Sequence, residues 1–199
     1  LLAGGTSNTV VGARAFYAAD GTETNNAIIG TDAGNAINHD DTDGNVIIGH
    51  DAGTGGSAAL IGNVVIGRNA MNSTGNNAHT GIVAIGFDAL TALTSGAKNT
   101  AIGYQCMDAT DDGAWNTAVG YQALSANCGN NNVAVGVSSL IATTGEANTA
   151  VGTQTLQANT SGDGNVAIGN GALMASTTAS DNLAIGRDAL VNLNHANST

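Results

Sequence analysis

One short phrase recurs eleven times along this chain, and its spacing limits the fold more than any other feature. The phrase ends with Val or Ile followed by Gly, as in NTAIG (99–103) and NTAVG (116–120). Successive copies lie about 16 to 19 residues apart, and a short period of this kind predicts a repeat fold in which each unit buries its apolar surface only by stacking on its neighbours. The repeat glycines are Gly12, Gly30, Gly49, Gly67, Gly86, Gly103, Gly120, Gly136, Gly152, Gly169 and Gly186.

Each phrase predicts a three-residue strand that is apolar on both faces. The residue before the Gly is always Val or Ile, and the residue two positions earlier is usually β-branched, so these two share a face. We expect this face, represented by Ile102 and Val119, to point into the coil. The middle residue points the other way, and a strand apolar on both sides must be covered on both sides. We therefore expect the middle residue to contact a partner chain. It is Val10, Ile28, Ile47 and Val65 in the first four copies and Ala84, Ala101, Ala118, Ala134, Ala150, Ala167 and Ala184 in the others.

The rest of each unit predicts turns. Asn opens ten of the eleven phrases, with Ile82 as the exception. Asn and Gly both suit turns, and stacked Asn side chains can form an amide ladder. A small residue and then Leu or Met usually follow the Gly, which predicts a second short strand or a tight corner, and the remaining segment is an exposed turn of variable length.

A parallel β-solenoid explains this pattern better than helical repeats do. Helical repeats need about 33 to 47 residues per unit, and Gly, Asn and Thr are poor helix formers. Eleven coils separated by the strand spacing of about 4.8 Å span roughly 50 Å.

Composition and charge exclude several partners. The formal charge is −11, with 4 Lys and Arg against 15 Asp and Glu, so the chain has no basic patch for nucleic acid. No apolar run approaches the roughly 20 residues of a membrane span. The opening LLAGG has neither an initiator Met nor a signal-peptide layout, so we expect the chain to be a fragment or a processed product of a longer protein.

The phrases NTAVGYQAL (116–124), NVAIGNGAL (165–173) and NLAIGRDAL (182–190) resemble two groups of repeat proteins. One is the head of YadA-like trimeric autotransporter adhesins, with N-S-V-A-I-G units, and the other is the tandem N-T-A-V-G-Y-Q-A-L repeat of phage tail-fibre-like proteins. The resemblance extends from Asn8 to Leu190. It implies a left-handed parallel β-roll wound as a homotrimer, with the small middle residue near the trimer contact. The units are longer than the usual coil of the adhesin heads.

These observations together predict an all-β, single-domain solenoid over residues 1–199. Bulkier middle residues should hold the chains farther apart, so we expect coils 1–4 (about 8–80) to form a wider section and coils 5–11 (about 81–199) a slimmer one. The expected function is structural and not enzymatic, as a segment of an extracellular phage tail fibre involved in host attachment. The alternatives are a bacterial adhesin head on the cell surface and a monomeric solenoid that binds carbohydrate or ice. A cell-surface glycan or protein would be the receptor, bound through the variable turns.

Few residues suggest chemistry. Asp41, Asp43 and Asn45 alternate as in part of a calcium loop, but the distant bidentate Glu is missing, so a solvated turn is the favoured interpretation and calcium the one cofactor considered. His39, His50, His79 and His195 fall at different places in the unit and are expected on the surface. Tyr104 and Tyr121 occupy equivalent positions, which favours stacking between coils over sugar binding. Cys106 replaces the usual Ala and is expected to be a buried small residue. No catalytic constellation recurs.

Overall fold

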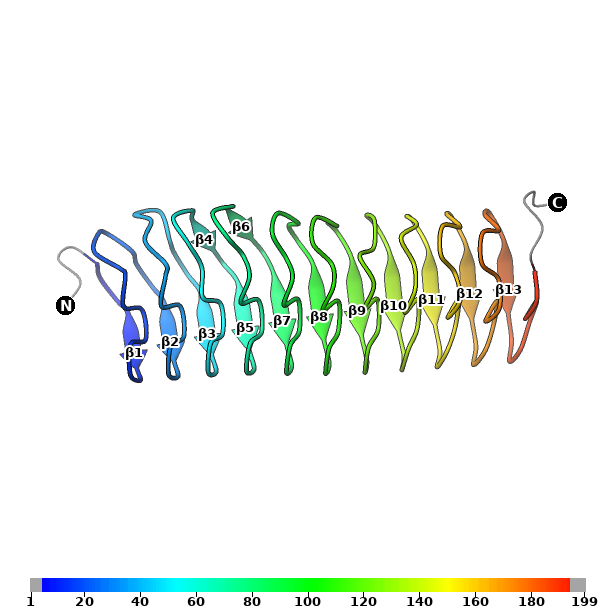
Figure 1. Ribbon diagram of the computed structural model, residues 1–199, viewed down its shortest axis with the longest axis horizontal. Helices are drawn as coiled ribbons and strands as arrows, with labels where there is room; N and C mark the ends of the chain where they lie inside the picture. The colour runs from blue at the N-terminus through cyan, green and yellow to red at the C-terminus, as the bar shows by residue number, and fades with distance from the viewer. Residues whose placement is uncertain (1–4, 194–199) are drawn as a thin grey trace.

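The computed structural model describes residues 5–193, which form a rod of stacked coils with the two termini at opposite ends (Figure 1). These residues contain no helix, and eleven parallel strands make one continuous sheet along the rod. Its strands are β1 (Thr9–Val11), β2 (Ala27–Ile29), β3 (Val46–Ile48), β5 (Val64–Ile66), β7 (Val83–Ile85), β8 (Thr100–Ile102), β9 (Thr117–Val119), β10 (Val133–Val135), β11 (Thr149–Val151), β12 (Val166–Ile168) and β13 (Leu183–Ile185). The predicted parallel β-solenoid is therefore confirmed.

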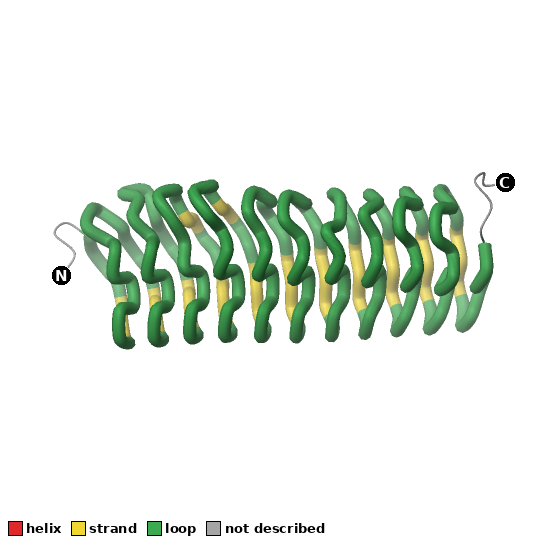
Figure 2. The backbone as a smooth tube through the Cα atoms, viewed as in Figure 1, coloured by secondary structure: helices red, strands yellow, loops and turns green. Residues whose placement is uncertain are grey.

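The register of the sheet follows the repeat residue by residue. Middle residues pair with middle residues, as Ala101 does with Ala118. The strands lie one beside the next along one side of the rod, and apart from the two short segments Leu60–Ile61 and His79–Thr80 the rest of each coil is turn and loop (Figure 2). Differences in coil length are absorbed in those loops, because every strand keeps the same pairing.

The repeat glycines are required by the close approach of successive coils. Gly120 has a φ of +143°, a conformation that L side chains rarely adopt. A Cβ atom at this position would lie 2.5 Å from the carbonyl oxygen of Gly136 in the next coil. The column of glycines thus lets the backbone turn out of the strand while the coils remain one strand spacing apart.

The interior of each coil holds the middle strand residue together with residues of the turn after the Gly. Coil 3 combines the large Ile47 with Gly53, whereas coil 7 combines the small Ala118 with Leu124. The side chains of Ile47, Ala118 and Leu124 are fully buried. A Cβ on Gly53 would lie 3.1 Å from the Cδ1 atom of Ile47. In these two coils, a large residue at one of the two positions is therefore combined with a small residue at the other, and the pair together fills the interior of the coil.

This packing explains differently why the middle residue changes from Val or Ile to Ala after coil 4. The bulky middle residues Ile28, Ile47 and Val65 are fully buried inside their own chain. Their size cannot hold neighbouring chains apart, so the expected difference between a wider and a slimmer section loses its physical basis.

A ladder of Asn side chains lines the interior beside the strands, as the sequence predicted. The backbone N–H and the side-chain amide of Asn45 donate to Oδ1 of Asn26 at 3.0 and 2.9 Å, and the same amide donates to the carbonyl of Leu60 at 2.6 Å. Ile82 interrupts the ladder, and its backbone N–H alone reaches Oδ1 of Asn63, at 2.9 Å. Buried amides with partners on both sides stabilise the stack, because an unpaired buried polar group is costly.

The segment after each Gly is a tight corner and not a second strand. Its residues alternate in backbone handedness, so Gln122 and Leu124 both have a φ of +51°. The side chain of Leu124 is fully buried, and this burial offsets the cost of the left-handed conformation.

The first coils carry a short second ladder. Strands β4 (Leu60–Ile61) and β6 (His79–Thr80) pair in parallel, and isolated bridges continue this ladder back through Asp43 to Thr24. The extra residues of these longer coils thus form additional structure outside the main sheet.

Candidate interaction face

The outward side of the eleven-stranded sheet, which we call the outer face, carries a continuous column of Val and Ile, and four of its strands begin with Thr. It consists of the first and third residues of each strand, and each of them is exposed or half-buried in the single chain. Ile102 is 37% and Ile168 40% exposed, which is high for Ile in mid-rod coils. The third-position residues are Val11, Ile29, Ile48, Ile66, Ile85, Ile102, Val119, Val135, Val151, Ile168 and Ile185.

The predicted orientation of the strand is wrong, because the two faces are exchanged. The Ala residues expected at the trimer contact are buried in their own chain, and Ile102 and Val119 face outward. The period of two groups residues by face but does not say which face is inside. The narrow coil also has to hold Asn and Leu side chains, so a small middle residue fits there. The misplaced contact residues are Ala84, Ala101, Ala118, Ala134, Ala150, Ala167 and Ala184, which are at most 2% exposed.

The outer face still requires a partner to cover it, although its residues are not the ones that the sequence predicted. The strand is apolar on both faces as the sequence indicates, and the chain covers only the inner one. An exposed apolar patch that runs along a whole molecule is unusual for a soluble monomer and marks an interaction surface.

One edge of the outer face carries a stack of aromatic rings, formed by residues directly after the repeat glycines. The rings of Phe87 and Tyr104 lie 5.2 Å apart and those of Tyr104 and Tyr121 5.5 Å apart, with interplanar angles of 7° and 8°. The guanidinium of Arg68 lies 5.8 Å from the centre of the Phe87 ring. The predicted stacking of the tyrosines between coils is confirmed. The stack places a ring on each side of Tyr104 and on one side of Tyr121.

The opposite edge is formed by the residues just before the repeat Asn. Each of them has a positive φ, and Gly fills this position in four of the eleven coils. Lys98 and Trp115 are the large residues in this column, and both are exposed, Trp115 by 56%. Sequence reasoning missed this left-handed corner, although the glycines in equivalent positions were a visible signal for it. They are Gly44, Gly62, Gly81 and Gly164.

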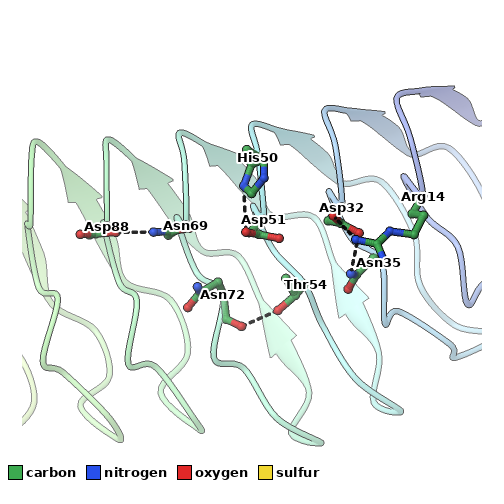
Figure 3. A network of polar contacts seen from close by, with 9 residues as sticks. All are labelled: Arg14, Asp32, Asn35, His50, Asp51, Thr54, Asn69, Asn72 and Asp88. Carbon is green, nitrogen blue, oxygen red and sulfur yellow. Dashed lines mark hydrogen bonds and ion pairs between the residues drawn. The ribbon is translucent and has the colours of Figure 1, made fainter.

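Polar side chains two residues after the glycines form a second column (Figure 3). The side chain of Arg14 donates to Asp32 of the next coil at 2.7 Å. The side chain of Asn69 likewise donates to Asp88 of the next coil at 2.9 Å. The hydrogen bond to Arg14 lowers the pKa of Asp32, and the same bond raises the pKa of Arg14. These contacts link successive coils on the surface of the rod.

Asp32, His50 and Asp51 offer ligand atoms within 4.8 Å of one another, the one such group among residues 5–193. All three are already engaged: Asp32 accepts from Arg14, and Nδ1 of His50 lies 2.8 Å from Asp51 (Figure 3). A cation here would have to displace the guanidinium, so the arrangement favours a network between coils over a metal site.

The calcium candidates are not brought together. Asn45 lies inside the coil as a rung of the amide ladder, whereas Asp41 is exposed. Asp43 accepts hydrogen bonds from Asn25 and Thr24, both at 2.8 Å, and these bonds lower the pKa of its carboxyl. The interpretation of a solvated turn therefore fits Asp41 alone, and Asp41, Asp43 and Asn45 do not form one calcium site.

The histidines and cysteines divide between surface and interior. His50 is exposed as expected, but His79 is fully buried, with Nδ1 3.2 Å from the carbonyl oxygen of Gly96. His195 lies outside the described residues. Cys106 and Cys128 are both buried and free, and burial raises the pKa of Cys106 to about 12. Cys106 is therefore the small interior residue that the sequence predicted.

Comparisons with known proteins do not assign this chain to a family. No family model, no curated protein and no solved structure matches the chain. Within residues 5–193, no helix has the length and apolar character needed to cross a lipid bilayer.

Proposed function

We propose that this chain is a structural segment of a homotrimeric extracellular fibre, with the outer faces of three chains packed around a common axis. The observation that carries the proposal is the uncovered Val and Ile column, which continues over all eleven strands of the sheet. The two outward positions of every strand together match the roughly 20 to 30 residues that each partner contributes to a standard stable interface.

A second copy is the partner that fits this surface best. The outer face repeats with the spacing of the strands, and another copy of the same sheet presents the same period and the same apolar residues. Fully burying a Val or Ile side chain contributes about 1.5 to 3 kcal/mol, so covering the half-exposed column strongly favours assembly. A homotrimer with a left-handed β-roll in each chain agrees with the family resemblance of the repeats.

The role of such an assembly would be mechanical. Continuous backbone hydrogen bonding along each rod resists bending, and the charge of −11 keeps separate fibres soluble and apart. A phage tail fibre is the function we favour, and a bacterial adhesin head is the second candidate. Attachment to a glycan or protein receptor would use the variable turns, which lie away from the outer face.

Native mass spectrometry and sedimentation at micromolar concentration test the proposal. The expected species contains three chains. The variant Val119→Asp should be a folded monomer, because it places a charge in the middle of the buried interface. Ser161→Asp, an exposed turn position, is the matched control and should remain trimeric.

A stable monomer of the unaltered chain would contradict the fibre proposal. The same preparation would then be tested for ice-crystal shaping and glycan binding, the properties of the competing class. Thr9, Thr100, Thr117 and Thr149 would be the aligned hydroxyls of an ice-binding face.

A further inference from the structure

The Val and Ile column of the outer face cannot by itself fix how the three chains align. Its residues are nearly the same in every coil, so one chain could slip along another by a whole coil and keep most apolar contacts. A fibre with one defined length and shape therefore needs residues at the interface that differ between coils.

The two edges of the outer face carry such residues. The residue before the repeat Asn lies at the start of each strand, and the residue after the repeat Gly lies at its end, so they flank the sheet on opposite sides. In a ring of three chains, a rotation brings the first edge of one chain next to the second edge of the following chain. With the threefold axis parallel to the rods, equal coils lie at nearly one level.

Two neighbouring coils, 6 and 7, carry large residues on both edges, whereas coils 4 and 5 have Arg68 and Phe87 on the second edge and Gly on the first. In coil 6, Lys98 is on the first edge and Tyr104 on the second; in coil 7, Trp115 is on the first. The ring on the second edge of coil 7 is Tyr121, 48% exposed. Aromatic pairs and cations over aromatic rings are both favourable contacts.

Trp115 is the bulkiest residue in a column that has a left-handed backbone in every coil. It has a φ of +58°, in a column where several other coils use Gly. A left-handed conformation costs a bulky residue roughly 1 to 2 kcal/mol. Buried Leu124 recovers such a cost by packing inside its coil, but the exposed indole of Trp115 gains little within its own chain. Lys98 and Ala147 have the same backbone conformation, so the repeat sets it, and the large exposed ring of Trp115 is the feature that points to a contact outside the chain.

Charge supports the same alignment at the C-terminal end of the sheet. Coil 11 carries Asp181 on the first edge and Arg187 on the second, and both are exposed, with Nε of Arg187 3.3 Å from Asp188 of its own chain. At equal level, the carboxylate of one chain would face the guanidinium of the next. A displacement by one coil would place Asp181 opposite Asn170 instead.

We propose that Trp115 of one chain packs against Tyr121 of the next, that Lys98 packs against Tyr104, and that these contacts set the axial alignment of the homotrimer. The inference rests on the proposed trimer. In a closed ring the displacements at the three seams must cancel, so a slip that brings Trp115 onto Tyr104 at one seam moves it onto Val137 at another. Equal alignment is thus the arrangement that keeps an aromatic partner at every seam.

Disulfide trapping in the full chain tests the alignment. The double variant Trp115→Cys, Tyr121→Cys places its two thiols on opposite edges of one sheet, too far apart for a disulfide within a chain. Under mild oxidation it should give a covalent trimer on a denaturing gel. The matched control Trp115→Cys, Thr153→Cys has its second thiol two coils away and should not.

Trp115 is the one Trp of the chain, so its fluorescence gives a second readout without any substitution. In the trimer its emission should be blue-shifted and its quenching by acrylamide at least twofold weaker than in the Val119→Asp monomer. Tyr121→Thr, a residue found at this position in coils 2 and 9, should restore quenching while the chain stays folded.

The outcomes distinguish the alignment contacts from the trimer on which they depend. A trimer in which Trp115 stays as quenchable as in the monomer, or in which the control pair cross-links instead, overturns the alignment contacts and leaves the trimer standing. A monomer at every concentration overturns both.

Discussion

The side-chain oxygen of Asn148 accepts hydrogen bonds from both the backbone N–H and the side-chain amide of Asn165, each at 3.0 Å. Both residues are fully buried, and the amide of Asn148 itself donates to the carbonyl of Gly162 at 2.8 Å. The rung therefore ties neighbouring coils together through one side chain, and the same arrangement recurs along most of the rod.

Asn148→Ala should lower the free energy of unfolding by about 2 to 4 kcal/mol, because it leaves two buried donors of Asn165 without an acceptor. Urea unfolding followed by circular dichroism measures the loss. Asn170→Ala at an exposed position is the control and should change stability by less than about 0.5 kcal/mol. Equal stability of the two variants would mean that the ladder contributes nothing to the fold.

Gly120→Ala should destabilise the rod by more than about 2 kcal/mol, since the new Cβ would meet the carbonyl oxygen of Gly136 and the positive φ is itself unfavourable. Gly75→Asn is the control, because Gly75 has a φ of +57° but nothing within 4 Å of the place that an added Cβ would take. Thermal unfolding of the two variants side by side measures the difference. If Gly120→Ala unfolds at the temperature of the unaltered protein, the close approach of the coils is not a constraint.

The size exchange between the middle residue and the corner can be tested by transplanting the coil 3 pair into coil 7. Ala118→Ile alone should cost about 1 to 3 kcal/mol through overpacking, and Leu124→Gly alone about 2 to 5 kcal/mol through a cavity. The double variant reproduces the pair Ile47 and Gly53, so its loss should be smaller than the summed losses by more than about 1 kcal/mol. Additive losses would show that the two positions do not share one space.

The ion pair between Arg14 and Asp32 predicts a pH-dependent contribution to stability. The pKa of Asp32 is lowered in the folded chain, so the pair stabilises the fold above the unfolded-state pKa of about 4 and loses this effect as the pH falls through the folded value. The stability difference between the unaltered protein and Asp32→Asn should thus be largest near neutral pH and vanish in strong acid. Unfolding measured from neutral to strongly acidic pH checks the sign, and a difference that grows on acidification would contradict it.

The two cysteines should be unreactive in the folded protein. Burial raises the pKa of both thiols, that of Cys106 to about 12, so little thiolate forms near neutral pH and reagents cannot reach it. Maleimide should label neither residue natively and both in denaturant, whereas an added surface thiol in Ser161→Cys should react at once. Rapid native labelling of Cys106 would show that its coil opens.

Sequence reasoning predicted the repeat, the parallel solenoid and the Asn ladder because each depends on local pattern. A phrase that recurs eleven times with Gly at a fixed place specifies a coil, and this signal does not depend on tertiary contacts. The left-handed corners were missed, since residues as different as Leu124 and Trp115 adopt them and no single residue type marks the position. The buried position of His79 was missed for a similar reason, because it depends on the extra ladder of the longer coils.

Local pattern alone dictated that the strand has two apolar faces and that the chain stacks with a period of about 16 to 19 residues. Which face is inside became clear only from the packing of the whole coil. The alternation of side chains is symmetric between the faces, and the choice depends on how each closed coil packs as a whole: Asn116, Ala118 and Leu124 fill coil 7, whereas the longer coil 4 holds Val65 beside Met71. The first and third residues of each strand are left on the outside, where they form the surface through which this protein would meet its own copies.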